Sequence, residues 1–254
     1  MNKINSLIRA FLVLFCFAFF GAGGLVISYI IFPLQKAFGR KDEDLRLRYG
    51  ETLQKSWRFF VNMLLALKII KIKSDDMERL KNIKNSIIVS THPSYIDILI
   101  LISIIPCSTC FVAEKLMHNP FFKRIVSRIF IPEGTPAQEW TKEACEMFEL
   151  GFNLIIFPMG TRHKKGEYPK IRRGVALIAQ KARKNIVMLD METSFDFLQI
   201  HEPVYKAGVE PVEYSISYLG ELDTAQLMEK YPDEVTFKTE ATKLIAKNLY
   251  HDKN

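Results

Sequence analysis

The chain has 254 residues, of which 48% are hydrophobic and 25% are charged, so a packed core is expected and extensive disorder is excluded. Its 35 lysines and arginines outnumber the 28 aspartates and glutamates, which gives a formal charge of +7. This excess suits an anionic membrane surface, an acidic carrier protein or a phosphate-bearing substrate. Because no recognised nucleic-acid-binding motif accompanies the charge, we expect no nucleic-acid partner.

An apolar segment begins the chain. Residues 10–34 carry no charged side chain, and a helix of that length would reach about 38 Å, more than a hydrocarbon core of about 30 Å. A secretory signal peptide is the alternative, but the run is longer than the usual apolar region of roughly 7–15 residues, and no clean cleavage site follows. Gly21, Gly23 and Gly24 offer a place where the helix would bend or turn back. We therefore expect residues 1–35 to form a transmembrane or re-entrant anchor.

Basic residues are more numerous after the apolar segment than before it. This bias predicts that the body of the protein lies on the cytoplasmic face of the inner or cell membrane. Lys3 and Arg9 precede the segment. The basic residues that follow it are Lys36, Arg40, Lys41, Arg46 and Arg48.

Residues 36–80 are expected to form a charged connection and an amphipathic helix. Apolar residues recur at helical spacing between Tyr49 and Ile70. Two placements fit this pattern. The helix would either pack on the following domain or lie in the membrane interface, with Trp57 and Arg58 at the level of the headgroups.

From residue 81 onward, short apolar runs alternate with helical stretches. This alternation predicts an α/β fold with a mainly parallel or mixed sheet, covered by helices on both faces, in a domain of residues 81–254. The charged tail after Leu222 is expected to be helical. The predicted strands are residues 86–90, 108–113, 153–157 and 186–189, and the predicted helices are residues 95–105, 138–150 and 173–184.

The four cysteines do not indicate a metal or disulfide framework. Cys16 lies in the apolar segment, and Cys107 and Cys110 form a C-x-x-C pair. No second pair follows at zinc-finger spacing, and the pair does not open a helix of the thioredoxin type. We therefore expect small, packed side chains near a buried strand and no metal.

The first chemically informative segment is Ile87–Asp97, IIVSTHPSYID. A predicted strand ends just before His92, and Pro93 directs the chain into the next helix. Asp97 then lies close enough to orient one nitrogen of the imidazole and leave the other free to accept a proton. A structural histidine with a satisfied carboxylate is the alternative. A histidine–carboxylate pair without a serine nucleophile suits direct attack by a hydroxyl of the substrate.

The second segment is Leu154–Lys165, LIIFPMGTRHKK, which again carries a strand into a polar turn. Gly160 allows backbone N–H groups to approach an anion, and Arg162 can bind phosphate oxygens with two donors. An ordinary polar turn is the alternative. One such segment after each of two core strands predicts a shared site.

Several blocks of the chain, over roughly residues 86–222, resemble the acylglycerol-phosphate (lysophosphatidic acid) acyltransferases and their bacterial relatives. His92–Asp97 resembles the family's H-x-x-x-x-D box, and Phe157–Arg162 resembles its F-P-E-G-T-R box. Phe111–Ile131 is similar to the intermediate block, and Arg173–Ala179 to the R-G-x-x-x-I-A helix.

The resemblance implies transfer of a fatty acyl group from an acyl-CoA or acyl-carrier-protein thioester to a hydroxyl of a lysophospholipid-like (1-acylglycerol-3-phosphate-type) acceptor. It implies that His92 is the general base, that Asp97 is its partner, and that no metal or further cofactor takes part. The implied partners are membrane lipid, the acceptor and the acyl donor. The expected substrate-binding residues are Ser94, Pro158, Gly160, Thr161 and Arg162.

The chain departs from the family pattern at three places. Met159 stands where the family has glutamate, and the middle block ends Phe130–Pro132 without its arginine. Ile186–Ser194 lacks the proline-bearing pattern that the family often has after the last core strand. The acceptor is therefore less determined than the thioester chemistry, and Met159→Glu is expected to change acceptor preference. The middle block and Pro203–Tyr205 also resemble acyltransferases associated with aryl polyene lipid synthesis, which implies a carrier-bound donor.

Pro132–Thr135 spells P-E-G-T but lies too early in the chain for the third box. We interpret it as a turn before the helix at Gln138 and do not count Glu133 among the site residues. Two other functions remain open: a lipid thioesterase, and a non-catalytic relative that binds lipid or acyl carrier protein. The lack of a G-x-S-x-G sequence argues against a serine hydrolase.

Overall fold

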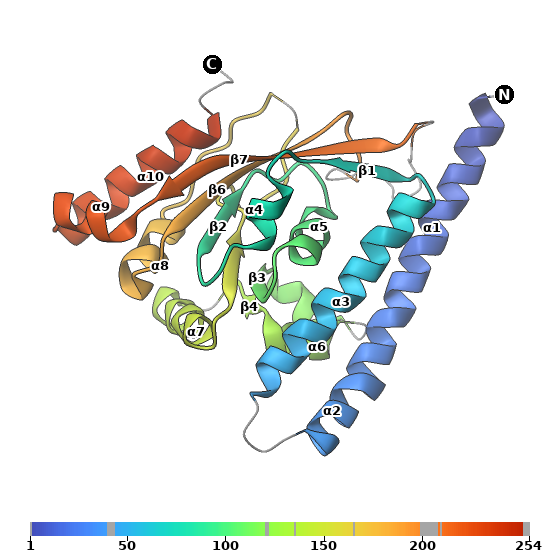
Figure 1. Ribbon diagram of the computed structural model, residues 1–254, viewed down its shortest axis with the longest axis horizontal. Coiled ribbons are helices and arrows are strands. Elements are labelled where there is room, and N and C mark those ends of the chain that lie inside the picture. Colours follow the sequence, from blue (N-terminus) through green and yellow to red (C-terminus); the bar gives the residue numbers. More distant parts are fainter. Residues whose placement is uncertain are drawn as a thin grey trace.

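Seven strands form one sheet at the centre of the computed structural model, which describes residues 2–39, 44–119, 122–134, 136–164, 166–198, 208 and 210–250 (Figure 1). The spatial order is β1-β7-β6-β2-β5-β3-β4. All neighbouring strands are parallel except β6 and β7, so the predicted mainly parallel sheet is confirmed. The strands are β1 (Ile70–Lys73), β2 (Ile87–Ser90), β3 (Ser108–Val112), β4 (Ile131–Pro132), β5 (Asn153–Ile156), β6 (Ile186–Thr193) and β7 (Val212–Leu222).

The centre of the sheet is a buried aliphatic layer. Every residue of β2 is buried, and β2 lies between β5 and β6. β-branched residues such as Ile87, Ile88 and Val89 suit a strand that is covered on both faces. Because β2, β5, β3 and β4 are mutually parallel, their carboxyl ends lie at one edge of the sheet, where α/β folds bind ligands.

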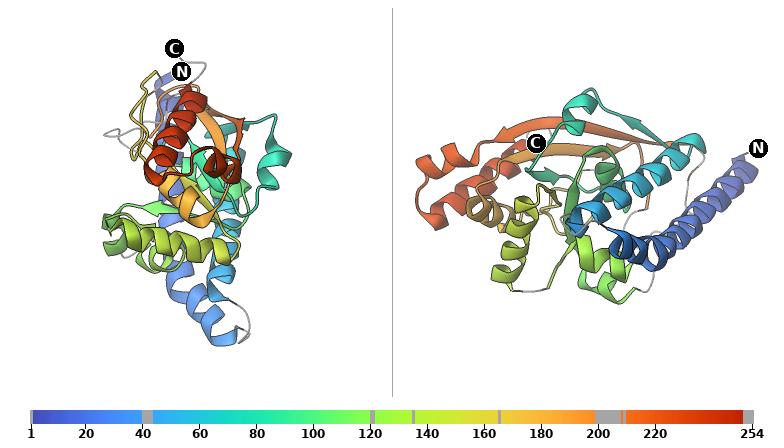
Figure 2. Two further views of the ribbon diagram at one scale, coloured as in Figure 1. Left: turned by 90° about the vertical axis from the view of Figure 1, so that its left-hand side faces the viewer. Right: turned by 60° about the horizontal axis from the view of Figure 1, so that its bottom comes forward.

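Helices cover both faces of this sheet, as expected (Figure 2). One layer contains α7, α8 and α10, which contact one another through α8 and also contact β5, β2 and β6. The other layer contains α3 (Leu45–Ala66), α5 and α6. The remaining bounds are α4 (Met77–Lys81), α5 (Asp97–Ile104), η2 (Glu114–His118), α6 (Lys123–Ile129), α7 (Ala137–Glu149), α8 (Gly174–Ala182), α9 (Thr224–Lys230) and α10 (Glu234–Tyr250).

The N-terminal apolar segment is one continuous helical rod made of α1 (Asn2–Val26), the π-helical η1 (Ile27–Ile31) and α2 (Phe32–Phe38). It does not turn back at the glycines as a re-entrant hairpin would. Instead, a π-helical turn precedes Pro33, whose missing N–H and ring disfavour regular helical hydrogen bonding at that point. Its Ser6–Phe38 portion is long and apolar enough to cross a membrane by length and composition.

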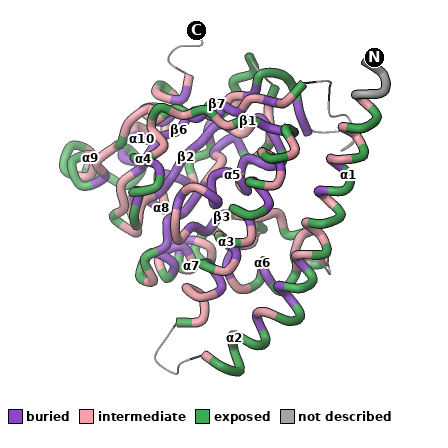
Figure 3. Tube along the Cα trace, turned by 45° about the vertical axis from the view of Figure 1, so that its right-hand side comes forward, coloured by how far each residue is buried: buried purple, intermediate pink, exposed green. Residues whose placement is uncertain are grey.

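Helix α3 returns along the N-terminal rod and packs between it and the domain (Figure 3). Its apolar stripe, which includes Leu53, Trp57 and Leu64, is buried. Arg58 donates from Nε to the carbonyl oxygen of Ser103, 3.0 Å away. The packed placement of this amphipathic helix is therefore the one observed, and Trp57 is not at a lipid-facing position.

The predicted strands and helices of the central domain are present within a few residues of their expected bounds, whereas β1, β4 and β7 were not predicted. β1 joins the sheet before the expected domain start at residue 81. All four cysteines are free thiols. No group of three or more metal-ligating side chains occurs in the part of the chain that the structure describes.

Candidate active site

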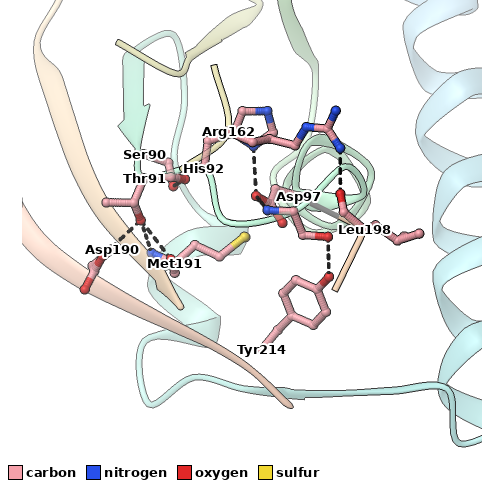
Figure 4. A network of polar contacts seen from close by, with 10 residues as sticks. Ser90, Thr91, His92, Asp97, Arg162, Asp190, Met191, Leu198 and Tyr214 are labelled. Carbon is pink, nitrogen blue, oxygen red and sulfur yellow. Dashed lines mark hydrogen bonds and ion pairs between the residues drawn. The ribbon is translucent and has the colours of Figure 1, made fainter. Parts of the chain in front are cut away.

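His92 and Asp97 meet in the loop that follows β2. His92 Nδ1 lies 2.8 Å from Asp97 Oδ2 (Figure 4), so the contact expected between them is present. Asp97 is the first residue of α5, and the chain between the two residues passes through Pro93. The His92 side chain keeps 17% of its surface exposed, whereas that of Asp97 is fully buried. Because Nδ1 is engaged by the carboxylate, Nε2 is the nitrogen left to accept a proton.

Asp97 is held in an environment that is only partly polar. Its Oδ2 also accepts a hydrogen bond from the backbone N–H of Ser94 at 2.7 Å, while Oδ1 is buried without a hydrogen-bond partner among the described residues. Burial raises the pKa of Asp97, and the hydrogen bond and charge of His92 offset part of that increase. The carboxylate is therefore fixed in position and strongly dependent on the imidazole for stabilisation.

Three further hydrogen bonds hold the His92 loop on the sheet. The Tyr214 hydroxyl, fully buried on β7, donates to Ser94 Oγ at 2.8 Å. On the other side, Thr91 Oγ1 donates to Asp190 Oδ1 and accepts from the backbone N–H of Met191 on β6. The loop is thus fixed by β6 and β7, which are distant in sequence (Figure 4).

The loop that follows β5 lies against the His92 loop. Its Phe157 ring stacks on the imidazole of His92 with a centroid distance of 3.9 Å, and the N–H of His163 donates to the carbonyl oxygen of His92 at 3.1 Å. Gly160 has φ +74°, a left-handed conformation that favours glycine. The two segments singled out from the sequence are therefore joined in one site, as expected from one such segment after each of two core strands.

Arg162 extends from this loop and is held by its surroundings. Its Nη1 donates to the carbonyl oxygen of Leu198 at 2.6 Å, and its Cζ lies 5.3 Å from the centre of the Tyr95 ring. Burial lowers the pKa of Arg162, and the charges of Tyr95 and Asp97 offset part of that decrease. Arg162 therefore presents a guanidinium of defined orientation beside the histidine–carboxylate pair.

A cavity of about 690 Å³ opens where these loops meet. Its polar lining includes the His92 imidazole together with Thr161, Arg162 and Arg172. Its apolar lining includes Trp140 of α7, whose ring is edge-on to the Phe111 ring with the ring centroids 5.6 Å apart. The volume is typical of a small-molecule site with an apolar wall and a few converging polar groups. The other apolar lining residues include Leu116, Ile155, Ile156, Val175 and Ile178.

The structure places four of the five expected substrate-binding residues in the cavity wall: Pro158, Gly160, Thr161 and Arg162. Ser94 is the exception. It is fully buried and absent from the lining, because its hydroxyl is turned toward Tyr214 and its N–H toward Asp97. Ser94 therefore positions the Asp97 carboxylate and does not face the cavity.

The structure also differs from the expectations for Met159 and Glu133. Met159 is 4% exposed, packs in the hydrophobic core and does not line the cavity, so it is not placed to contact an acceptor. Glu133, which we did not count among the site residues, does line the cavity. It follows β4, whose carboxyl end shares the sheet edge with β3 and β5. The carboxylate was missed because a two-residue strand leaves little trace in a sequence.

Comparison with known proteins relates this part of the chain to a family of enzymes. Residues 71–192 match the model of the acyltransferase family, and this range contains β2, β5 and the loops that carry His92, Asp97 and Arg162. The matched residues, just under half of the chain, are thus similar to the acyltransferase family. This match agrees with the resemblance to acyltransferases seen in the sequence, whereas the resemblance to the aryl polyene branch is not tested. Pro203–Tyr205, on which it partly depends, lies outside the described residues.

Two plant proteins named 1-acyl-sn-glycerol-3-phosphate acyltransferase are similar to this chain. The protein from Cocos nucifera is 31% identical over 109 residues, which cover 40% of this chain and 35% of the relative. The protein from Limnanthes douglasii is 28% identical over 162 residues, which cover 61% of this chain and 56% of the relative. This chain therefore matches only about a third to just over half of the length of these relatives.

A solved structure shares the fold over the whole chain. The 1-acyl-sn-glycerophosphate (LPA) acyltransferase PlsC from Thermotoga maritima has a TM-score of 0.71 and 16% sequence identity, and the match covers 100% of this chain and 98% of that chain. At this identity the likeness establishes the fold alone. The fold includes the N-terminal helical rod and α3 as well as the sheet.

Proposed function

We propose that this protein is an O-acyltransferase that moves a fatty acyl group from a thioester to a hydroxyl of a lysophospholipid-like acceptor of the 1-acylglycerol-3-phosphate type. The observation that carries the proposal is the 2.8 Å contact between His92 Nδ1 and Asp97 Oδ2 at the wall of a cavity that also contains Arg162. The names of the two plant relatives supply the acceptor class.

In the proposed mechanism, His92 acts as a general base. Asp97 accepts a hydrogen bond from the Nδ1–H group of His92, which leaves Nε2 unprotonated. Nε2 then takes the proton of the acceptor hydroxyl while the hydroxyl oxygen attacks the carbonyl carbon of the thioester. The C–S bond then breaks, and the leaving thiolate takes the proton from the imidazolium. No protein nucleophile, metal or cofactor beyond the acyl-donor substrate is needed for this sequence of steps.

The cavity suits both parts of an acyl transfer. Thr161 and Arg162 lie beside His92, so an anionic headgroup held there would place a neighbouring hydroxyl near the imidazole. The apolar wall around Phe111 and Trp140 would receive an acyl chain. A lining that combines converging polar groups with apolar side chains supports a lipid substrate.

We further propose that the N-terminal rod attaches the protein to the inner or cell membrane, with the catalytic domain on the cytoplasmic face. One side of the rod is fastened to the domain: Arg9 donates to the carbonyl oxygens of Lys68 and Glu210, and the Phe20 and Phe60 rings lie 4.7 Å apart. The other side carries exposed apolar residues and is suited to contact lipid. They include Leu7, Ile8, Phe11, Leu14, Phe15, Phe19, Leu25, Val26, Tyr29, Ile30, Leu34 and Phe38.

The acyl donor is proposed to be acyl-CoA or acyl carrier protein. Both are anionic, which agrees with the formal charge of +7. The resemblance to acyltransferases associated with aryl polyene lipid synthesis favours the carrier-bound donor. Supplying each donor separately to the same enzyme preparation would decide between them.

The decisive experiment measures acyl transfer by the purified full chain in detergent micelles. Labelled acyl-CoA or labelled acyl carrier protein is supplied with a 1-acylglycerol 3-phosphate, and the labelled lipid product is separated from free fatty acid. His92→Ala is expected to lower transfer by roughly 100-fold to 10,000-fold, because general-base catalysis contributes about that much. His118→Ala, which removes an exposed histidine outside the cavity lining, is the matched control and should retain activity.

Three outcomes would count against the proposal. Full activity of His92→Ala would exclude the histidine as the base. Label that appears only as free fatty acid would indicate a thioesterase. Binding of donor and acceptor without turnover by the wild type would indicate a non-catalytic relative.

A further inference from the structure

Arg172 lines the same cavity as Arg162 but reaches it from a different part of the chain. It lies two residues before α8, at the end of the loop that follows Gly160. Its backbone N–H donates to the carbonyl oxygen of Pro158 at 2.9 Å, so the end of the loop is fastened to its beginning. This hydrogen bond holds Arg172 over the turn that contains Gly160.

The Arg172 guanidinium occupies the space where a side chain at residue 160 would begin. A Cβ atom added to Gly160 would overlap Arg172 Cζ and its neighbouring nitrogens. Glycine therefore serves two purposes at this turn. It adopts the φ of +74°, and it leaves room for the guanidinium to lie directly on the backbone.

The two arginines differ in how much of their donor capacity is already used. Arg162 donates to Leu198 and lies over the Tyr95 ring. Arg172 is exposed, and among the described residues no carboxylate forms an ion pair with it. An exposed guanidinium next to a cavity that already holds one arginine is suited to an anion of the substrate.

We infer that Arg172 is a substrate-binding residue, placed by Gly160, that contacts the phosphate of the acceptor together with Arg162. The inference deepens the proposed function and rests on it for the acceptor class. Arg162 would fix the orientation of the phosphate because it is itself fixed, whereas Arg172 would supply most of the additional affinity. Gly160 would matter through Arg172 and not only through its own backbone.

The test compares Arg172→Gln with Arg173→Gln in the full chain. Both variants remove one positive charge, but Arg173 is exposed and does not line the cavity. Binding of a 1-acylglycerol 3-phosphate in nonionic detergent micelles is measured by tryptophan fluorescence, to which Trp140 in the cavity wall contributes. A monoacylglycerol with the same acyl chain is the probe without phosphate.

We expect Arg172→Gln to weaken binding of the phosphate-bearing lipid by about tenfold or more, as loss of a charge-assisted hydrogen bond does. Arg173→Gln should change it less than about twofold, and neither variant should affect the monoacylglycerol. In turnover, Arg172→Gln should raise KM for the acceptor and leave both kcat and KM for the donor within a few-fold. Equal effects of the two variants, or a rise only in KM for the donor, would overturn the inference.

Gly160→Ala tests the placement of Arg172. In the wild-type background it should weaken phosphate-dependent binding about as much as Arg172→Gln, and in the Arg172→Gln background it should add little. If Gly160→Ala weakens phosphate-dependent binding by the same factor in the wild-type and the Arg172→Gln backgrounds, Gly160 does not act through Arg172. Phosphate-dependent binding that depends on Arg172 in a protein without transferase activity would contradict the proposed function and support this inference.

Discussion

The loops that follow β2 and β5 lie side by side at one edge of the sheet, yet they hold their functional groups differently. In the β2 loop, Asp97 is completely buried, and the backbone of Ser94 and the imidazole of His92 fix its carboxylate. In the β5 loop, Gly160 and Thr161 are exposed, and the chain is held mainly where it touches the β2 loop and Arg172.

This difference matches what each loop is proposed to do. Proton transfer requires a histidine held in one orientation and tautomer, which a buried partner provides. Binding of a headgroup requires donors that remain accessible to a ligand from outside. On the proposed function, catalysis is therefore assigned to the end of β2 and recognition of the acceptor to the end of β5.

The largest effect in the β2 loop is expected from Asp97→Asn. The amide cannot stabilise an imidazolium as a carboxylate does, so transfer should fall by roughly 100-fold or more. The substitution should not lower the stability of the folded protein. Burial raises the pKa of Asp97, so the unfolded chain ionises at lower pH than the folded one, and the ionised carboxylate costs folding free energy at neutral pH.

Two measurements check this prediction: acyl transfer activity, and thermal unfolding at neutral pH. The unfolding temperature of Asp97→Asn should equal or exceed that of the wild type, while activity is lost. A protein that is both inactive and markedly less stable would show that Asp97 supports the fold and would leave the catalytic loss without a specific cause.

The pairing of His92 with Asp97 could be predicted because both residues lie in one short loop, where spacing along the chain limits their separation. Ser94 shows where this reasoning fails. Ser94, a polar residue close to the proposed catalytic histidine, was expected to face the substrate. Its hydroxyl instead accepts a hydrogen bond from the Tyr214 hydroxyl on β7. Nothing in the local sequence reveals a partner on a strand 120 residues away.

The same reasoning separates the predicted from the unpredicted strands. β2 and β5 are short runs of buried aliphatic residues and were recognised from the sequence. β7 alternates buried and exposed residues along part of its length, as in VEYSIS, and it pairs with the short edge strand β1. Arg172 was missed for a related reason, since its contact with the Gly160 turn depends on the path of the whole intervening loop.

The next effect concerns Met159, on the inner side of the β5 loop. Met159→Glu would place a carboxylate in the hydrophobic core, and we expect the free energy of unfolding to fall by about 3 kcal/mol or more. Met159→Leu, which conserves volume, should cost less than about 1.5 kcal/mol. Denaturant unfolding of both variants measures the difference. A stable Met159→Glu protein with altered acceptor preference would instead place residue 159 in the substrate site.

The smallest effect is expected at Glu133, beyond the two loops on the same sheet edge. Its carboxylate lines the cavity with Arg162 and Arg172 and opposes an anionic ligand through space. Because Glu133 is exposed, solvent screens this repulsion, and Glu133→Gln should lower KM for a phosphate-bearing acceptor by only about twofold. The difference should shrink as salt is raised, since the interaction is electrostatic. A higher KM in the variant would mean that Glu133 binds a positively charged or hydrogen-bonding group of the acceptor, so that recognition extends from β5 to the end of β4.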